Sequence, residues 1–389
     1  MPSGQDSVPN LREERDVKFP MTRVGVIGCG YWGPQLIRNF AEMADSQLFG
    51  VADKRQDRLN YVRSRYGGVR TYTDHTALLA SDVEAVVVAT PIHSHFTIAR
   101  EALLAGKHVM VEKPLCSSVA ESLELVRLAN DGQLILMVGH TFLYNQAVAE
   151  LRRILHDPEF GKVFYVDSAR LNLGRFSPHS NVIWDLAPHD VSILIHILGR
   201  NPVAVSAFGS THVQANIHDV AYVRIEFEGG VNAQVHVSWL DPAKVRRITV
   251  VGDKQMVVYN DVSLSEKIRI YNKGVTASPT DTFGEFQLSY RYGSVTIPYI
   301  EPAEPLRAEC QHFLTCVRSG QSPLTDGMAG LAIVAVLEAA NCSLKNDGRR
   351  QPVTLPERWS PNLTAEDILP SLVDADAGQA MVDSGRAAS

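Results

Sequence analysis

Short apolar runs alternate with amphipathic segments through the first third of the chain. The runs are rich in β-branched residues, show no polar face, and occupy residues 24–27, 48–52, 85–89, 108–111 and 134–138. Strands covered on both faces of a parallel sheet have this composition. Amphipathic patterns that predict helices lie between them, at residues 34–43, 96–104 and 119–129. The alternation predicts a doubly wound α/β sheet in the N-terminal part.

The pattern changes after about Gly161. In residues 231–239 apolar positions alternate with polar ones, which is the period of a half-buried strand. Further strands are predicted at residues 203–208, 220–227, 247–252 and 256–259. We therefore predict an α+β C-terminal domain with a large antiparallel or mixed sheet, one face of which packs on helices. A helix over residues 329–340 is expected to return to the N-terminal sheet.

Composition and charge narrow the class of protein. A chain of 389 residues is longer than a usual domain with a single hydrophobic core. Its content of 45% hydrophobic and 21% charged residues is typical of a globular protein. A net charge of −6 argues against a nucleic-acid partner. The five cysteines show no C-x-x-C spacing, which favours reduced thiols and a cytoplasmic location. The sequence shows neither the apolar core of a signal peptide nor a run of eighteen apolar residues, so we expect no membrane partner.

A glycine-rich motif of the form G-x-G-x-x-G follows the first predicted strand directly. It consists of Gly28, Cys29, Gly30, Tyr31, Trp32 and Gly33. The first glycine permits a tight turn, the second lets the backbone approach a pyrophosphate, and the third lets the helix pack closely on the strand. With a strand before it and a helix after it, the motif predicts a Rossmann domain that binds a dinucleotide.

The residue that ends the second predicted strand bears on which dinucleotide binds. A carboxylate at Asp53 would accept hydrogen bonds from an adenosine ribose and repel a 2′-phosphate, which favours NAD over NADP. Lys54 and Arg55 follow at once. They either offset that repulsion at the cofactor or are solvated surface cations.

Several motifs resemble those of the Gfo/Idh/MocA family of NAD(P)-dependent sugar and cyclitol oxidoreductases. They lie at residues 89–95 (A-T-P-I-H-S-H), 112–114 (E-K-P), 139–140 (G-H), 184–190 (W-D-L-A-P-H-D) and 323–327 (P-L-T-D-G). The resemblance covers about residues 21–355. The sequence departs from the family pattern at Ala187, where the family has glycine, and at Ser192, where an aspartate is usual, although Asp190 stands nearby.

The resemblance implies that Lys113 works at the reacting hydroxyl. Oxidation of a secondary alcohol requires a base for the proton while the cofactor takes the hydride. A partly desolvated lysine beside a cationic nicotinamide has a lowered pKa, since both effects oppose its charge. Glu112 is expected to orient Lys113, and a cis peptide bond before Pro114 would be a deliberate feature of this loop.

Asp185 and His189 stand four residues apart and so share one face of a helix. The resemblance implies that this face lines the substrate pocket opposite Lys113. An imidazole suits proton exchange at neutral pH, and Asp185 either binds a sugar hydroxyl or orients that imidazole. The alternative is an Asp–His pair on a helix surface. Lys113 and His189 both remain candidates for the base.

The remaining candidates are residues near the same strand ends. Expected cofactor contacts are Thr90, Pro91 and His95. For His95, capping the following helix is the alternative. Expected substrate contacts are His140, Tyr144 and Trp184. No metal site is predicted, because no acidic or cysteine partner stands at a suitable spacing from the H-x-H pair at residues 93–95.

Arg170, Asn172 and Arg175 are expected to face one side of a predicted strand over residues 163–173. Two arginines that point into a pocket suit a phosphate or carboxylate, as in a nucleotide-linked sugar. The alternative is that they pair with surface charges.

Together these features predict an NAD(H)-dependent oxidoreductase that interconverts a secondary hydroxyl and a ketone on a sugar. The resemblance suggests C3 of a nucleotide-linked hexose. One alternative is an NAD-dependent, glycosidase-like enzyme that works by oxidation, elimination and reduction; another is a non-enzymatic NAD-binding regulator. The family's habit also implies a homodimer or homotetramer formed through the C-terminal sheet.

The predicted division of the chain follows from these assignments. Residues 21–145 form the NAD-binding Rossmann domain, and residues 146–355 form a substrate-binding and oligomerisation domain. Residues 1–20 are polar with mixed charge and are predicted to be disordered, and residues 356–389 are predicted to form a polar tail.

Overall fold

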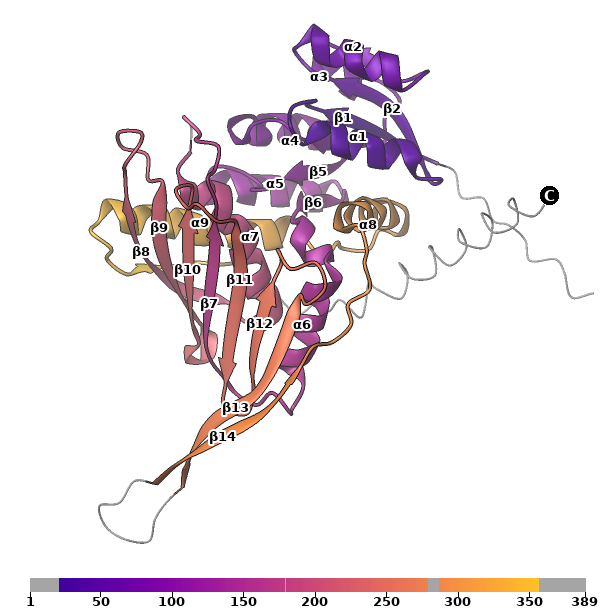
Figure 1. Cartoon of the computed structure of the whole chain (residues 1–389). Helices are drawn as coiled ribbons and strands as arrows, with labels where there is room; N and C mark the ends of the chain where they lie inside the picture. The colour runs from indigo at the N-terminus through magenta and orange to yellow at the C-terminus, as the bar shows by residue number, and fades with distance from the viewer. Residues whose placement is uncertain (1–20, 179, 279–286, 357–389) are drawn as a thin grey trace, which may run out of the picture.

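The computed structural model describes residues 21–178, 180–278 and 287–356 (Figure 1). The tails predicted from the sequence fall outside these residues, apart from Pro356. The described chain forms two sheets, which we call the nucleotide sheet and the large sheet.

The nucleotide sheet has six parallel strands in the order β3-β2-β1-β4-β5-β6. Its strands are β1 (Thr22–Ile27), β2 (Ser46–Ala52), β3 (Arg70–Tyr72), β4 (Ala85–Val88), β5 (His108–Glu112) and β6 (Leu136–Gly139). The helices between them are α1 (Gly33–Glu42), α2 (Gln56–Arg65), α3 (His75–Leu79), α4 (His95–Leu104) and α5 (Val119–Asp131), with the short η1 (Ile92–Ser94). The predicted Rossmann architecture is confirmed, because this is the strand order of a doubly wound dinucleotide fold.

The elements α2, β3 and α3 have no counterpart among the apolar runs and amphipathic patterns of the sequence. In α2 most side chains are polar, and only Leu59 and Val62 are buried. The strand β3 has three residues, none of them fully buried, at the edge of the sheet. Short edge elements of this kind carry too few apolar positions to show a period.

The large sheet has nine strands in the order β14-β13-β12-β11-β7-β10-β9-β8-β15. They are β7 (Val163–Leu171), β8 (Pro202–Ser210), β9 (Val220–Phe227), β10 (Asn232–Ser238), β11 (Val245–Gly252), β12 (Met256–Asn260), β13 (Ile268–Ser278), β14 (Gln287–Thr296) and β15 (Gln351–Pro352). The pair β7–β10 is parallel, whereas β7–β11 and β9–β10 are antiparallel. The predicted mixed sheet is confirmed.

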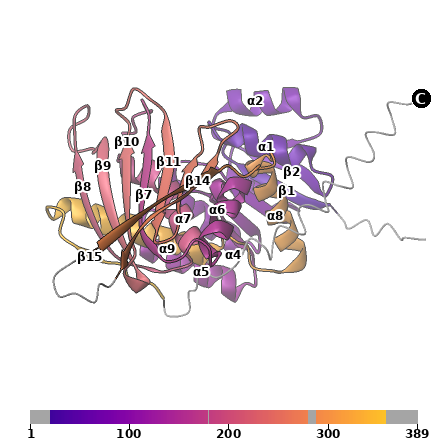
Figure 2. The same ribbon diagram turned by 60° about the horizontal axis from the view of Figure 1, so that its bottom comes forward.

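Helices join the two sheets. They are α6 (Gln146–His156), α7 (Val182–Leu198), α8 (Pro305–Ser319) and α9 (Gly327–Lys345), with the short η2 (Thr141–Tyr144). A further short helix, η3 (Glu228–Gly230), lies in the turn between β9 and β10. The helix α9 contacts α5 and β6 on one side and α7 and β8 on the other, so the C-terminal helix does return to the nucleotide sheet. Figures 1 and 2 show α7 and α9 along one face of the large sheet.

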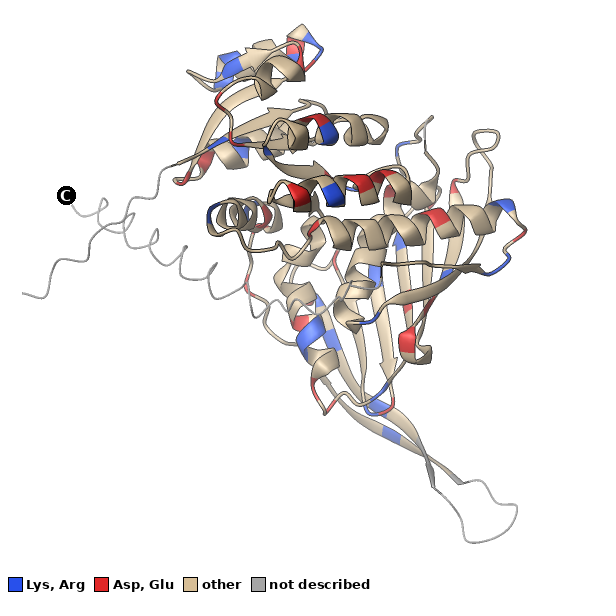
Figure 3. Ribbon diagram, turned by 180° about the vertical axis from the view of Figure 1, so that it is seen from behind, with Lys and Arg blue, Asp and Glu red and all other residues tan. Residues whose placement is uncertain are grey.

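By length and composition alone, α9 could cross a membrane. In this fold 61% of the apolar window is buried, which is typical of the core helix of a folded domain. Acidic and basic residues are interspersed along the described ribbon (Figure 3), in agreement with the modest net charge of the sequence.

Candidate active site

The glycine-rich loop joins β1 to α1 at the carboxyl edge of the nucleotide sheet. Gly28 has a φ of 100°, and a Cβ placed there would lie 2.6 Å from the Ala89 carbonyl oxygen. A Cβ at Gly33 would collide with the Gly28 carbonyl. At Gly30, by contrast, a Cβ would meet nothing within 4 Å. Two glycines are thus required by the fold itself, and the middle one leaves space beside the loop for a ligand.

Asp53 fixes this loop as well as marking the end of β2. Its Oδ2 accepts a hydrogen bond from the Cys29 amide at 2.7 Å, and its Oδ1 accepts one from the Arg55 amide at 2.8 Å. The side chain is 12% exposed. Because each carboxylate oxygen has two lone pairs, Asp53 can hold the loop and still accept from a ribose hydroxyl. Lys54 stands between Asp53 and Arg55 in the chain. The loop therefore fits a dinucleotide with an unmodified ribose.

The exposed aromatic residues of the loop contact both halves of the molecule. Tyr31 is 78% exposed, and the Arg175 guanidinium lies 4.8 Å from its ring centroid. The side chain of Trp32 lies near Glu112 of β5 and contributes to lowering the pKa of that carboxyl. The glycine-rich loop is thus connected to the E-K-P motif and to the segment that follows β7.

Lys113 follows β5, and its amine points to the start of α7. Its Nζ donates a hydrogen bond to the Asp185 carbonyl oxygen at 2.7 Å and lies 3.7 Å from the Asp185 Oδ1. The second oxygen, Oδ2, accepts a hydrogen bond from Trp239 Nε1 at 2.9 Å. Burial lowers the pKa of Lys113 below its ordinary 10.5, and Asp185 and Glu112 partly offset this effect. The Lys113–Pro114 peptide bond is cis.

His189 lies one helical turn beyond Asp185 in α7, as the spacing predicts. Its ring packs edge-on against Phe142, with centroids 4.9 Å apart, and its buried Nδ1 has no hydrogen-bond partner. Burial, together with the nearby charges of Lys113 and Arg170, holds the pKa of His189 well below 6.5. The imidazole is therefore neutral at physiological pH. The Asp185 carboxylate accepts a hydrogen bond from Trp239 and pairs with Lys113 rather than with the imidazole of His189.

Two buried carboxyl groups lie behind Lys113, and one of them is absent from the sequence predictions. Burial raises the pKa of Glu112 to about 7. Glu309 of α8 is fully buried, accepts a hydrogen bond from Thr141 at 2.7 Å, and has its other oxygen unpartnered. Burial and the nearby Glu112 raise the pKa of Glu309 well above 4.5. Burial thus opposes ionisation of both groups, and the nearby like charge adds to this effect at Glu309.

Other predicted site residues lie deeper than expected. His95 is 1% exposed, and its ring nitrogens lie 2.7 Å from the Thr90 oxygen and 2.9 Å from the Pro114 oxygen. It thus links the T-P loop to the E-K-P loop, and this geometry gives no support to a cofactor contact. Tyr144 is 6% exposed and pairs with the Thr325 hydroxyl at 3.2 Å, which places it in the core. Pro91 precedes η1.

His140 and Trp184 lie nearer to the lysine. His140 is 1% exposed with both ring nitrogens unpartnered, and burial lowers its pKa to about 3. The charge of Lys113 contributes to that shift. Trp184, in the first turn of α7, packs against both hydrophobic cores of the molecule. Both residues therefore border the region around Lys113.

The expectation for Arg170, Asn172 and Arg175 was wrong in its geometry. The strand β7 ends at Leu171, so Asn172 and Arg175 lie beyond it, and the Asn172 amide donates a hydrogen bond to the Ser238 carbonyl oxygen. Arg170 is 4% exposed and lies 2.5 Å from the Asp190 carboxylate. Arg175 lies over the glycine-rich loop instead. The three residues therefore do not share a strand face.

Two residues of the site were not predicted from the sequence, although each stands at a position where the apolar pattern of its strand or helix predicts burial. Arg246 of β11 is in phase with the buried Ile248 and Val250, so it belongs to the inner face. Glu309 falls on the apolar stripe of α8, three residues after the buried Leu306. A charged residue in a buried phase is informative, because burial of a charge is costly without a partner or a function. Within the described residues no group of three or more histidine, cysteine or acidic side chains could hold a metal ion.

The fold and these residues define an NAD-binding oxidoreductase with a Rossmann domain and a second sheet domain. The model of the oxidoreductase family with an NAD-binding Rossmann fold matches residues 22–140, and the model of the GFO/IDH/MocA C-terminal domain matches residues 148–258. The chain belongs to the Gfo/Idh/MocA family. The family resemblance seen in the sequence is thereby confirmed, and so is NAD as the cofactor class.

Named relatives act on sugars and cyclitols. The chain is 30% identical to UDP-N-acetylglucosamine 3-dehydrogenase from Acidithiobacillus ferrooxidans, over 80% of this chain and 94% of the relative. It is 25% identical to myo-inositol 2-dehydrogenase from Thermotoga maritima, over 83% and 96%. A solved structure of the Acidithiobacillus enzyme superposes with a TM-score of 0.71 at 26% identity, over 84% of this chain and 99% of the other. The protein is thus a dehydrogenase of a sugar-oxidising family.

Proposed function

We propose that the protein interconverts a secondary hydroxyl and a ketone on a sugar ring, with C3 of a nucleotide-linked hexose as the preferred position. The observation that carries the proposal is the convergence of Lys113, Asp185 and His189 at the carboxyl edge of the nucleotide sheet. This edge is where open α/β sheets bind their ligands. The choice of C3 is supported by the similarity to UDP-N-acetylglucosamine 3-dehydrogenase.

We assign proton exchange to Lys113 rather than to His189. Bound NAD supplies the hydride acceptor. A general base works best when its pKa lies near the working pH. Burial lowers the pKa of Lys113 below its ordinary 10.5, whereas the pKa of His189 falls well below 6.5 and leaves a weak base. The neutral His189 is suited to hold the hydroxyl by a hydrogen bond, and Asp185 holds the amine in place.

The test combines a substrate panel with one variant. Purified protein is mixed with NAD⁺ and with UDP-N-acetylglucosamine, D-glucose or myo-inositol, and the absorbance of the reduced cofactor is followed. Lys113→Met should keep NAD affinity and lower turnover about 100-fold or more. The matched control is Lys107→Met, because Lys107 caps a carbonyl at the opposite edge of the sheet.

The possible outcomes separate the candidate functions. Reduction of NAD⁺ by a sugar supports the proposal. Sugar cleavage without net reduction would instead indicate redox-assisted elimination, and silence with every sugar would favour a regulatory protein. Normal turnover of the Lys113→Met variant would remove Lys113 from its assigned role.

We also propose that the protein is a cytoplasmic homo-oligomer that pairs through the outer face of the large sheet. Tyr165, Phe208 and Tyr222 on this face are each about half exposed. Tyr222 stacks on His236, with ring centroids 4.3 Å apart. A face rich in exposed aromatic side chains is typical of a surface that another subunit covers. All five cysteines are free, as a reducing compartment requires.

A further inference from the structure

Two arginines lie directly opposite each other on the inner face of the large sheet. Arg170 of β7 is the register partner of Arg246 of β11 in an antiparallel pair. Directly opposed residues point to the same face, and like charges in such a pair are destabilising unless an anion lies between or beside them. The sequence pattern of residues 163–173 predicts arginines on this strand but does not predict Arg246 beside them.

Both guanidinium groups converge on one aromatic ring at the active site. The Cζ of Arg170 lies 4.6 Å from the centroid of Phe142, and that of Arg246 lies 5.5 Å from it. The ring of His189 packs edge-on against the same Phe142. Both arginines also act on His189, since their charges contribute to lowering its pKa. His189 and Arg246 thus both lie against Phe142.

The carboxylates around this pair leave part of its donor capacity unused. Asp190 binds Arg170 through Nε, while the buried Nη1 of Arg170 has no partner. Asp261 lies 3.1 Å from Arg246 and 3.8 Å from Lys267, so one carboxylate serves two cations. An unpartnered buried guanidinium nitrogen is costly, and a ligand oxygen would satisfy it.

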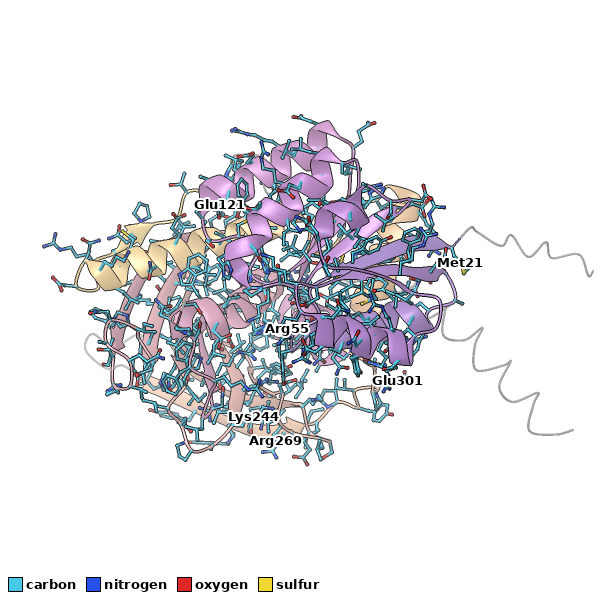
Figure 4. All side chains as sticks on the ribbon, turned by 90° about the horizontal axis from the view of Figure 1, so that it is seen from above. Met21, Arg55, Glu121, Lys244, Arg269 and Glu301 are labelled. Carbon is cyan, nitrogen blue, oxygen red and sulfur yellow. The ribbon has the colours of Figure 1, made fainter. Side chains whose placement is uncertain are left out.

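The pair is also open on one side. Arg170 is almost fully buried, whereas the side chain of Arg246 is 34% exposed. Figure 4 views the two domains from above, with Arg55 on the nucleotide domain and Lys244, just before β11, on the large-sheet domain. Arg246 can therefore meet a ligand from the solvent side, while Arg170 supports it from within.

We propose that Arg246, backed by Arg170, binds an anionic group of the sugar substrate, either a carboxylate or a phosphate. The proposal rests on the proposed sugar-oxidising function and adds its substrate class. A planar guanidinium presents two parallel N–H donors that match the oxygens of either group. The neutral part of the same sugar then lies at His189 and Lys113.

Binding measurements test the proposal independently of turnover. Protein saturated with NADH is titrated calorimetrically with D-glucose, D-glucuronate, D-glucose 6-phosphate and UDP-N-acetylglucosamine. At least one anionic probe should bind about 10-fold or more tightly than glucose. The identity of that probe distinguishes a carboxylate from a phosphate. Arg246→Gln should weaken its binding about 10- to 100-fold and leave glucose unaffected.

Two further variants control for charge and for folding. Arg246→Lys keeps the charge without the guanidinium fork and should recover part of the anion affinity. Arg269→Gln removes a surface arginine of nearby β13, one that pairs with Glu266 before the strand, and it should change nothing. Equal binding of glucose and every anionic probe would overturn the proposal, as would an anion preference that survives Arg246→Gln. Selective anion binding without sugar oxidation would instead refute the proposed function alone.

Discussion

A methyl group at Gly30 should separate cofactor binding from folding. A Cβ at this position meets nothing within 4 Å, and the backbone is not in the left-handed region. Gly30→Ala should therefore leave the native fold unstrained. The lost freedom of the unfolded chain should even stabilise the protein by up to about 1 kcal/mol. Gly28 and Gly33 could not be changed in this way, because their Cβ atoms would collide with backbone atoms.

The same methyl group occupies the space through which a pyrophosphate would approach the loop. Its presence should remove at least one backbone hydrogen bond to a charged oxygen, which is worth about 1.5–3 kcal/mol. The affinity for NAD should then fall about 10- to 150-fold. Calorimetric titration with NAD⁺ and thermal unfolding without cofactor measure the two effects separately.

Gly67→Ala is the matched control for Gly30→Ala. Gly67 follows α2, has equally open space around its Cβ and has no positive φ. Its replacement should stabilise the protein by a similar amount, for the same reason, and should leave NAD affinity unchanged. Unchanged NAD affinity in Gly30→Ala would refute the reasoning that the open space belongs to the pyrophosphate. A loss of thermal stability in that variant would show that the loop, rather than the ligand, needs the glycine.

Two other predictions concern a buried acid and an exposed face. The pKa of Glu309 is raised in the folded state, so the folded protein holds a proton that the unfolded chain releases above its ordinary 4.5. The free energy of unfolding should therefore fall as pH rises above about 4.5, and Glu309→Gln should flatten this decline in urea titrations. In Tyr222→Lys, a subunit interface through the large sheet would place like charges near each other, and sedimentation should show dissociation.

A matched control variant accompanies each of these two predictions. Glu42→Gln changes an exposed acid on α1 and should keep the wild-type pH slope. An equal slope for Glu309→Gln would mean that Glu309 is ionised in the native protein. Tyr61→Lys changes a partly exposed tyrosine on α2 and should leave the assembly intact. A monomeric wild-type protein, or an unaffected Tyr222→Lys assembly, would contradict the proposed interface.

Much of the fold follows from local patterns in the chain. The strands β1, β4 and β5 are buried on both faces, so their unbroken apolar runs mark them without reference to any other segment. The glycine-rich loop is local only in part. The clash at Gly33 is with the Gly28 carbonyl in the same strand–helix turn, whereas the clash at Gly28 is with Ala89, which follows β4. The four-residue spacing of Asp185 and His189 likewise fixes their shared helix face.

The tertiary structure alone decided which of these residues meet. The sequence places Lys113 and Asp185 in separate elements, and only the packing of α7 against the end of β5 brings the amine to the Asp185 carbonyl. The approach of Glu309 to the E-K-P motif depends on the packing of α8 beside η2.

The pairing of Arg170 with Arg246 shows the same division between sequence and tertiary structure. Alternation along each strand assigns a side chain to a face, and the sequence determines that much. The register between β7 and β11 is set by the burial of whole strand faces, and a shift of one residue would turn Arg246 away from Arg170. The contacts between the charged residues of the site thus join segments that are distant in the sequence. The hydrophobic period of a single strand or helix cannot predict such contacts.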